Sequence, residues 1–218
     1  MNYFEGDKTL NREILEFGAG TGLLTEVLLR NYKDVTASDL SSEMVSVGER
    51  TRPESKWVQM DAWKPSFHKI DRICSASLLQ WANDPTKVLK KWKTLLKEGG
   101  RMSHLFYVSP SLKELYSIAD DLMPLTWYSR DEWECYFSEA GFTIDRSDIF
   151  EKKYVLRNSL ELLRLLHGIG AVYRNRNTSP GKLRNILKRY DEEFCSNDIE
   201  IEGVFSTWVF YKIECSIK

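Results

Sequence analysis

The segment Ile14–Gly22, ILEFGAGTG, constrains the fold more strongly than any other stretch of the chain. The apolar run from Arg12 to Phe17 predicts a short strand that leads directly into a loop with three glycines. Apolar residues at helical spacing then predict a helix over Leu23–Tyr32. A strand, a glycine loop and a helix in succession are typical of nucleotide-binding α/β folds, although turns of other kinds also use glycine for its geometry.

The alternation of strands and helices continues beyond this unit. A helix is expected to begin at the cap Asp84 and Pro85 and to continue to about Lys97, before Gly99 and Gly100. Its neighbours are expected to be strands over 34–40, 56–63, 71–79 and 101–108 and a helix over 41–52. This rhythm predicts an α/β fold, a Rossmann-like doubly wound sheet whose strands are mostly parallel.

The second half of the chain is less regular. The sequence Ser129–Glu132 is a capping box that opens a helix ending at Ala140. Further elements are expected to be strands over 142–155 and 204–215 and helices over 158–171 and 180–190. We therefore expect a sheet domain of residues 1–155 with 200–218. Residues 156–199 are expected to form a helical lid inserted between strands six and seven.

Charge and cysteine content restrict the functional classes. The 218 residues carry a formal net charge of −1, so the overall charge predicts no particular partner. The four cysteines are scattered without a CxxC pair, and the three histidines are equally dispersed. This pattern indicates reduced thiols in the cytoplasm and no metal centre. No apolar run is long enough to span a bilayer, and the polar start does not resemble a signal peptide.

Acidic residues decide which nucleotide suits the glycine loop. The dinucleotide motif would place its third glycine at position 23, which is Leu23. Asp39 falls where a ribose-binding acid belongs, and Asp61 could accept a hydrogen bond from an adenine amino group. Glu16 would oppose a pyrophosphate but would suit a ligand with a sulfonium and an ammonium group. Taken together, the three acids favour S-adenosylmethionine over NAD.

Four stretches, ILEFGAGTG, ASDLSSEM, QMDAW and SASLLQW, resemble in order and spacing the motifs of class I S-adenosylmethionine-dependent methyltransferases. The resemblance spans about residues 12–108. It implies a seven-stranded sheet with an antiparallel last strand, and S-adenosylhomocysteine as the product. The cofactor contacts that it implies are Glu16, Gly18, Ala19, Gly20, Thr21, Gly22, Asp39, Leu40, Met44, Asp61, Ala62, Trp63, Ser75, Ala76 and Ser77.

Three later stretches, ASLLQWANDP, PLTWYSRDEWECYFSEAGF and LLRLLHGIGA, look like the malonyl-[acyl-carrier protein] O-methyltransferases of biotin synthesis. This resemblance implies methylation of the free malonyl carboxylate. His167 and Val172 depart from the residues usual beside GIGA. The family also has about 30 or more residues before the first strand, whereas 13 precede Ile14 here.

A carboxylate acceptor needs no general base, because a carboxylic acid with a pKa near 4 is already ionised at pH 7. The enzyme must mainly align and desolvate the reacting groups. We therefore name no catalytic residue. The residues that we expect to line the acceptor pocket are Gln80, Trp81, Tyr107, Trp127 and Tyr128.

Between Val172 and Tyr190 the chain has six basic residues and no acidic one. Such a block is often only a solvated helix face, but it could also bind an acidic protein such as acyl carrier protein. The residues of this docking hypothesis are Arg174, Arg176, Lys182, Arg184, Lys188 and Arg189. The block has no interleaved aromatic residues, so we expect no nucleic-acid partner, and we expect a monomer.

Other interpretations stay open at this point. A carboxyl methyltransferase of the trans-aconitate type shares a similar SLQW motif. A protein that binds the cofactor without turnover is an alternative from another class. An NAD oxidoreductase is a third, and comparing thermal stabilisation by NADH and by S-adenosylhomocysteine would distinguish it.

Overall fold

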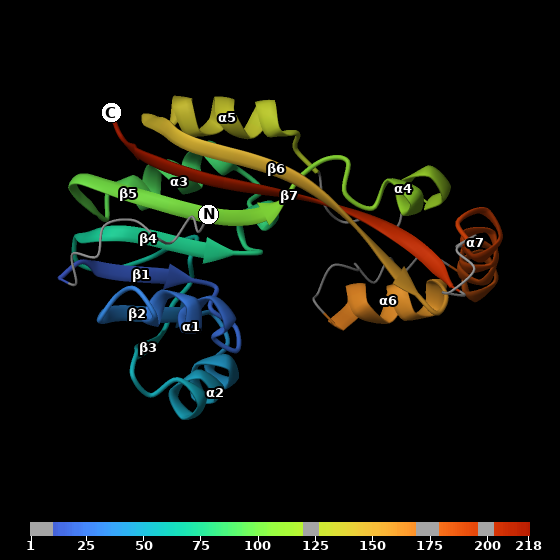
Figure 1. Ribbon diagram of the computed structural model, residues 1–218, viewed down its shortest axis with the longest axis horizontal. Coiled ribbons are helices and arrows are strands. Elements are labelled where there is room, and N and C mark those ends of the chain that lie inside the picture. The colour runs from blue at the N-terminus through green and yellow to red at the C-terminus, as the bar shows by residue number, and fades with distance from the viewer. Residues whose placement is uncertain (1–10, 120–126, 169–178, 196–202) are drawn as a thin grey trace. The chain divides into compact units, whose positions relative to one another are not determined.

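The computed structural model describes residues 11–119, 127–168, 179–195 and 203–218. One seven-stranded sheet runs through the molecule in the order β3-β2-β1-β4-β5-β7-β6 (Figure 1). In chain order the strands are β1 (Glu13–Phe17), β2 (Asp34–Asp39), β3 (Lys56–Gln59), β4 (Ile70–Ala76), β5 (Leu96–Tyr107), β6 (Phe142–Leu156) and β7 (Val204–Ile217).

Strands β1 to β5 form a parallel array. Glu16 of β1 lies opposite Ala37 of β2 and Cys74 of β4, so β1 is central and covered by neighbours on both edges. β7 runs antiparallel between β5 and β6, as Figure 1 shows. The predicted doubly wound seven-stranded sheet with an antiparallel last strand is confirmed.

Four of the helices begin at residues whose side chains cap them. Asp84 accepts a hydrogen bond from the backbone N–H of Lys87 at 3.0 Å, and Ser129 and Glu132 complete the predicted capping box. Ser41 and Ser179 cap two others. The α-helices are α1 (Leu23–Leu29), α2 (Ser42–Thr51), α3 (Pro85–Lys93), α4 (Lys113–Ala119), α5 (Arg130–Glu139), α6 (Ser159–Gly168) and α7 (Pro180–Glu193).

Several boundaries differ from the expectation: the first helix ends at Leu29, and the strands expected over 56–63 and 71–79 end at Gln59 and Ala76. Helix α3 ends at Lys93 rather than near Lys97, because Leu96 already pairs with Ile70 in the sheet and the carbonyl of Leu95 accepts from the N–H of Ile70. Gly99, in a left-handed conformation, therefore lies inside β5, where the register shifts. Helix α4 was not predicted, since its seven residues show too short an apolar pattern.

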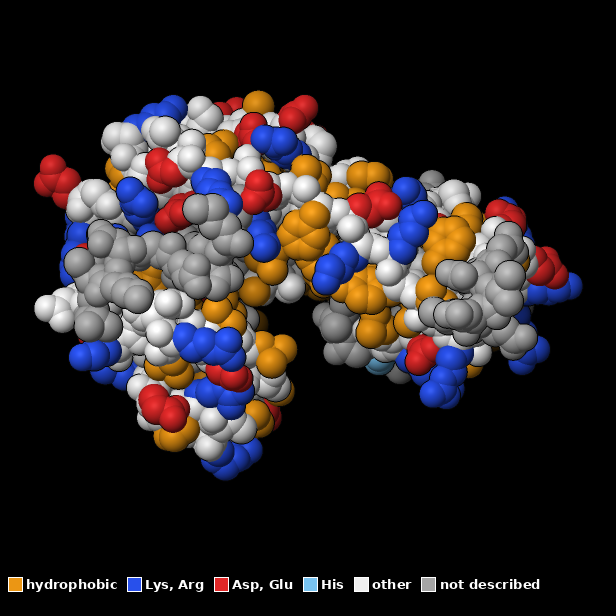
Figure 2. Space-filling view, in the orientation of Figure 1, with side chains coloured by type: hydrophobic (Ala, Val, Ile, Leu, Met, Phe, Trp, Pro, Cys, Tyr) orange, Lys and Arg blue, Asp and Glu red, His pale blue; other side chains and the backbone are white. Residues whose placement is uncertain are grey.

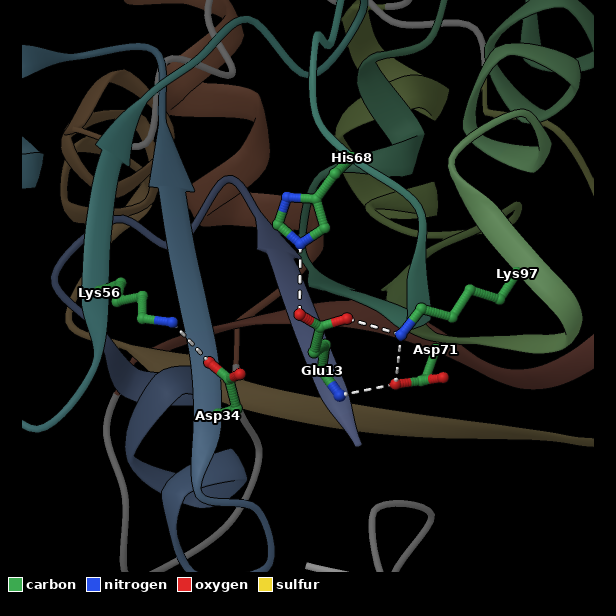
Figure 3. A network of polar contacts seen from close by, with 6 residues as sticks. All are labelled: Glu13, Asp34, Lys56, His68, Asp71 and Lys97. Atoms are coloured by element: carbon green, nitrogen blue, oxygen red, sulfur yellow. Dashed lines mark hydrogen bonds and ion pairs between the residues drawn. The ribbon is translucent and has the colours of Figure 1, made fainter. Parts of the chain in front are cut away.

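The amino edge of the sheet is fixed by charged side chains (Figure 3). Lys97 contacts Glu13 at 2.6 Å and Asp71 at 3.2 Å, while Asp71 also accepts from the backbone N–H of Glu13 at 2.8 Å. The hydrogen bond from Lys97 lowers the pKa of Glu13. His68 lies 3.3 Å from Glu13, and Lys56 pairs with Asp34 at 3.0 Å. These contacts lie at the starts of the strands, away from the edge where β1 to β3 end.

The chain divides into two compact units, which are described separately below. The first unit comprises Met1–Phe106, Ser129–Ile149 and Tyr211–Lys218, and the second comprises Tyr107–Tyr128 and Phe150–Phe210. Basic and acidic side chains are interspersed over the face shown in Figure 2, in accord with the small net charge. No helix among the described residues is long and apolar enough to cross a membrane.

Candidate functional site

The glycine loop that follows β1 has a backbone conformation that allows a ligand to come close to the main chain. Gly18, Gly20 and Gly22 all have positive φ, at 66°, 55° and 86°. Residues with a side chain seldom occupy this region. A Cβ on Gly18 would lie 3.0 Å from Leu78, whereas a Cβ on Gly20 would meet nothing within 4 Å. The loop is therefore tightly packed at Gly18 and open at Gly20, where a ligand could approach the backbone.

Asp39, the last residue of β2, is tied to this loop. One carboxylate oxygen accepts from the N–H of Gly20 at 2.8 Å, and the other accepts from the N–H of Ser41 at 3.0 Å. Each oxygen has a second lone pair for a further donor such as a ribose hydroxyl. Leu40 beside it is 66% exposed, and Met44 lies in the first turn of α2. The predicted ribose acid and the glycine loop thus lie together.

Glu16 lies beneath the loop and is almost completely buried, with 1% of its surface exposed. Its carboxylate accepts a hydrogen bond of 2.6 Å from the Thr25 hydroxyl of α1. Burial is the main cause that raises the pKa of Glu16 from 4.5 to about 7, with the Thr25 bond acting against it and the charge of Asp39 adding to it. A cation placed beside the loop would stabilise the ionised form of this carboxylate.

The stretch after β3 forms the next part of the same edge. Asp61 accepts from the N–H of Trp63 at 2.8 Å. The carbonyl of Ala62 accepts from the Trp92 indole at 2.6 Å, and the Trp63 and Trp92 rings are parallel at a centroid distance of 6.1 Å. The predicted adenine-binding segment is therefore held rigidly against α3.

The end of β4 is arranged differently from its neighbours. Ser75 is buried, and its hydroxyl lies 2.8 Å from Nδ1 of His104. Burial lowers the pKa of His104 to about 3, so the imidazole is neutral at physiological pH. Ser77 is exposed with a positive φ of 55°, and its N–H donates to the carbonyl of Leu105. Of the predicted trio, Ala76 and Ser77 have accessible surface, whereas the Ser75 side chain faces the core.

Comparisons with known proteins agree with this geometry. Residues 15–103 match the methyltransferase domain family. The chain is 27% identical to a malonyl-[acyl-carrier protein] O-methyltransferase of Paenibacillus sp. strain JDR-2, over 92% of this chain and 81% of that protein. It is 28% identical to the enzyme of the same name from Neorickettsia risticii, over 88% and 79%.

The fold has solved counterparts. The YcgJ protein of Bacillus subtilis superimposes with a TM-score of 0.68 at 16% identity, covering 96% of this chain and 93% of that one. A geranyl diphosphate methyltransferase in complex with S-adenosylmethionine gives 0.58 at 14% identity, over 95% and 79%. The matched domain and the relatives named O-methyltransferases support an S-adenosylmethionine-dependent methyltransferase.

The residues predicted for the acceptor pocket of this methyltransferase fall in both units. Gln80 and Trp81 belong to a short 3-10 helix, Leu79–Trp81, in the first unit. Gln80 is buried, and its Oε1 has no hydrogen-bond partner among the residues that the structure describes. In the second unit the rings of Tyr107 and Trp127 meet edge to face at 6.2 Å, and Tyr128 accepts from the N–H of Ser109. Gln80 and Trp81 are adjacent within the first unit, and Tyr107 and Trp127 are in contact within the second. The acceptor pocket itself stays a prediction.

The second unit of the methyltransferase has its own internal contacts. Glu114 of α4 accepts from both the N–H and the hydroxyl of Thr207 in β7. Ser159 of α6 donates to the carbonyl of Leu187 at 3.0 Å, and its N–H donates to Asp191 at 2.7 Å. These bonds join α4 to β7 and α6 to α7.

The predicted docking block is partly neutralised within its own helix. Arg174 and Arg176 lie outside the described residues. Lys188 pairs with Glu192 at 3.5 Å and Arg189 pairs with Glu193 at 3.2 Å, both one turn apart on α7. Lys182 and Arg184 lie nearer the start of the same helix. At least two of the four described cations of the block are therefore already paired with acids.

One feature of the methyltransferase was not predicted as a site. Trp63 and Trp81 line a pocket of about 700 Å³ beside α3 together with four lysines, which are Lys64, Lys87, Lys90 and Lys91. The lysines opposite the apolar stripe of α3 were visible in the sequence. Their meeting with Trp63, which follows β3, and with Trp81 of the 3-10 helix depends on tertiary structure. The described part of the chain contains no group of three His, Cys, Asp or Glu residues that could hold a metal ion.

Proposed function

We propose that this methyltransferase transfers a methyl group to the free carboxylate of malonyl-[acyl-carrier protein], forming the methyl ester used in biotin synthesis. The observation that carries the proposal is the similarity to two proteins of that name over about nine-tenths of this chain. It agrees with the resemblance of LLRLLHGIGA to the same family.

The cofactor edge fits S-adenosylmethionine, which supplies an electrophilic methyl carbon when bound. Asp39 would accept from the ribose hydroxyls, because it is already oriented by Gly20 and Ser41. Asp61, Ala62 and Trp63 would hold the adenine. Glu16 would balance the positive charge of the methionine part from beneath the loop.

The proposed acceptor chemistry requires no general base. A malonyl carboxylate is ionised at pH 7 and needs only alignment and removal of water. His104 is a poor candidate for a base, because it is buried, neutral and bonded to Ser75. We propose that Gln80 and Trp81, with Tyr107, Trp127 and Tyr128, contact the acceptor.

The test supplies labelled S-adenosylmethionine with three acceptors in parallel: malonyl-acyl carrier protein, malonyl-CoA and trans-aconitate. The proposal predicts label in an ester of the carrier-bound malonyl group. Label on trans-aconitate alone would instead support the small-acid carboxyl methyltransferase. Binding of S-adenosylhomocysteine without label on any acceptor would contradict the proposed substrate.

A further inference from the structure

The pocket beside α3 combines an apolar interior with a basic rim. We call the α3 pocket the space of about 700 Å³ lined by Trp63, Trp81, Lys64, Lys87, Lys90 and Lys91. Every one of these residues belongs to the first unit. Its size is within the range of protein sites that bind ligands or partner side chains.

The sequence of α3 places its cations on one face. Asp84 and Pro85 fix the start of the helix, and Val88, Leu89 and Trp92 are buried against the rest of the unit. Lys87, Lys90 and Lys91 are spaced three and four residues apart and lie exposed on the opposite face. Thr86 is fixed to Glu139 of α5 by a hydrogen bond of 3.1 Å, which anchors the helix.

The cations of the α3 pocket are uncompensated. Within the described part of the chain none of the four lysines forms an ion pair, and Asp84 is the one acid in the lining. Four lysines against one aspartate give the lining a net charge of +3. Helix α7 has four cations, but Asp191, Glu192 and Glu193 reduce its net charge to +1.

The two indoles give the pocket a rigid apolar base. Trp63 is stacked on Trp92, which is completely buried and donates to the carbonyl of Ala62. The indole of Trp63 is therefore held in place by its neighbours.

We propose that the α3 pocket, rather than α7, is the docking surface for the acidic acyl carrier protein; the inference rests on the proposed function. Carboxylates of the partner pair with Lys87, Lys90 and Lys91. The net charge of +3 favours an acidic partner, the proposed function supplies one in the carrier protein, and RNA is the alternative that the test distinguishes.

The test compares two variants with the same change in total charge. The first carries Lys87→Glu, Lys90→Glu and Lys91→Glu; the control carries Arg184→Glu, Lys188→Glu and Arg189→Glu on α7. Steady-state kinetics are measured with malonyl-acyl carrier protein and with a small malonyl thioester that has no phosphate. S-adenosylhomocysteine binding shows that each variant is folded.

The inference predicts that the α3 variant raises KM for the carrier protein at least about tenfold, with kcat and the small thioester unaffected. The α7 control should change KM much less. An increase confined to the α7 variant, or equal losses with both substrates, would overturn the inference. Loss of binding to a labelled RNA in the α3 variant, with the carrier KM unchanged, would also overturn it.

Measurements on the wild-type protein distinguish a failure of the proposed function from a failure of the docking inference. If it neither binds nor methylates the carrier, the proposed function fails and the docking inference fails with it. If it does both and the α3 variant behaves like wild type, only the docking inference fails.

Discussion

The buried carboxyl of Glu16 should make the stability of this protein depend on pH in a direction opposite to that of most acids. With 1% exposure and one hydrogen bond from Thr25, its pKa is raised from 4.5 to about 7. The folded state therefore holds this proton more tightly than the unfolded state. The stabilisation is complete below about pH 4.5 and is lost as pH rises through about 7.

The size of the effect follows from the two pKa values. Each whole pKa unit is worth about 1.4 kcal/mol, so the interval from 4.5 to about 7 corresponds to about 3 kcal/mol. Glu16→Gln keeps an acceptor for Thr25 and cannot ionise, so it should remove this contribution. Because its amide introduces a buried NH2 group, the test depends on the pH slope rather than on the absolute stability.

The assay is urea unfolding of wild type and Glu16→Gln at half-unit steps from pH 4.5 to 8, without cofactor. Between these limits the free energy of unfolding of wild type should fall relative to the variant by about 3 kcal/mol. Glu98→Gln, at an exposed position, is the control and should follow wild type. Parallel curves for wild type and Glu16→Gln would refute the reasoning.

Three other predictions concern the same unit. Gly48→Ala would push a Cβ into the Trp57 ring and should destabilise the protein by about 1 to 3 kcal/mol in chemical unfolding, whereas Gly181→Ala on α7 meets only Ser179 and should not destabilise it. Asp39→Ala removes the hydrogen bond that holds Gly20 and should weaken S-adenosylhomocysteine binding about tenfold or more, as measured by calorimetry. The control Asp34→Ala, at the opposite end of β2, should leave this affinity unchanged. Equal affinities of Asp39→Ala and wild type would contradict the role assigned to Asp39. The His104 imidazole should show no protonation in NMR spectra between pH 5 and 8, because burial lowers its pKa to about 3, and a titration midpoint in that range would disprove the buried geometry.

The sheet, and the meeting of the glycine loop with Asp39, could be predicted because their signals are local. The glycine spacing, the caps at Asp84 and Ser129 and the acids that end successive strands are each readable within a few residues. The sheet then brings Asp39 and the loop together, since parallel strands end at one edge. Local patterns therefore sufficed to predict a contact between two residues that are 19 positions apart in the sequence.

Features that depend on tertiary pairing were not predictable in the same way. The predicted end of α3 was wrong because Leu96 pairs with Ile70, which is far away in the sequence, and this pairing outweighs the helical periodicity. The Ser75 hydroxyl faces His104 from the neighbouring strand, which no local pattern indicates. The α3 pocket joins Trp63, Trp81 and one helix face, and only the folded chain shows its uncompensated charge.

The most direct test of the account is the intact mass of malonyl-acyl carrier protein after incubation with this methyltransferase and S-adenosylmethionine. The account predicts a mass increase that corresponds to replacement of the carboxyl hydrogen by a methyl group. The increase should be much slower with Asp39→Ala at low cofactor concentration, because this variant loses the contact that orients the loop. An unchanged carrier mass with wild-type protein that binds S-adenosylhomocysteine would contradict the central claim.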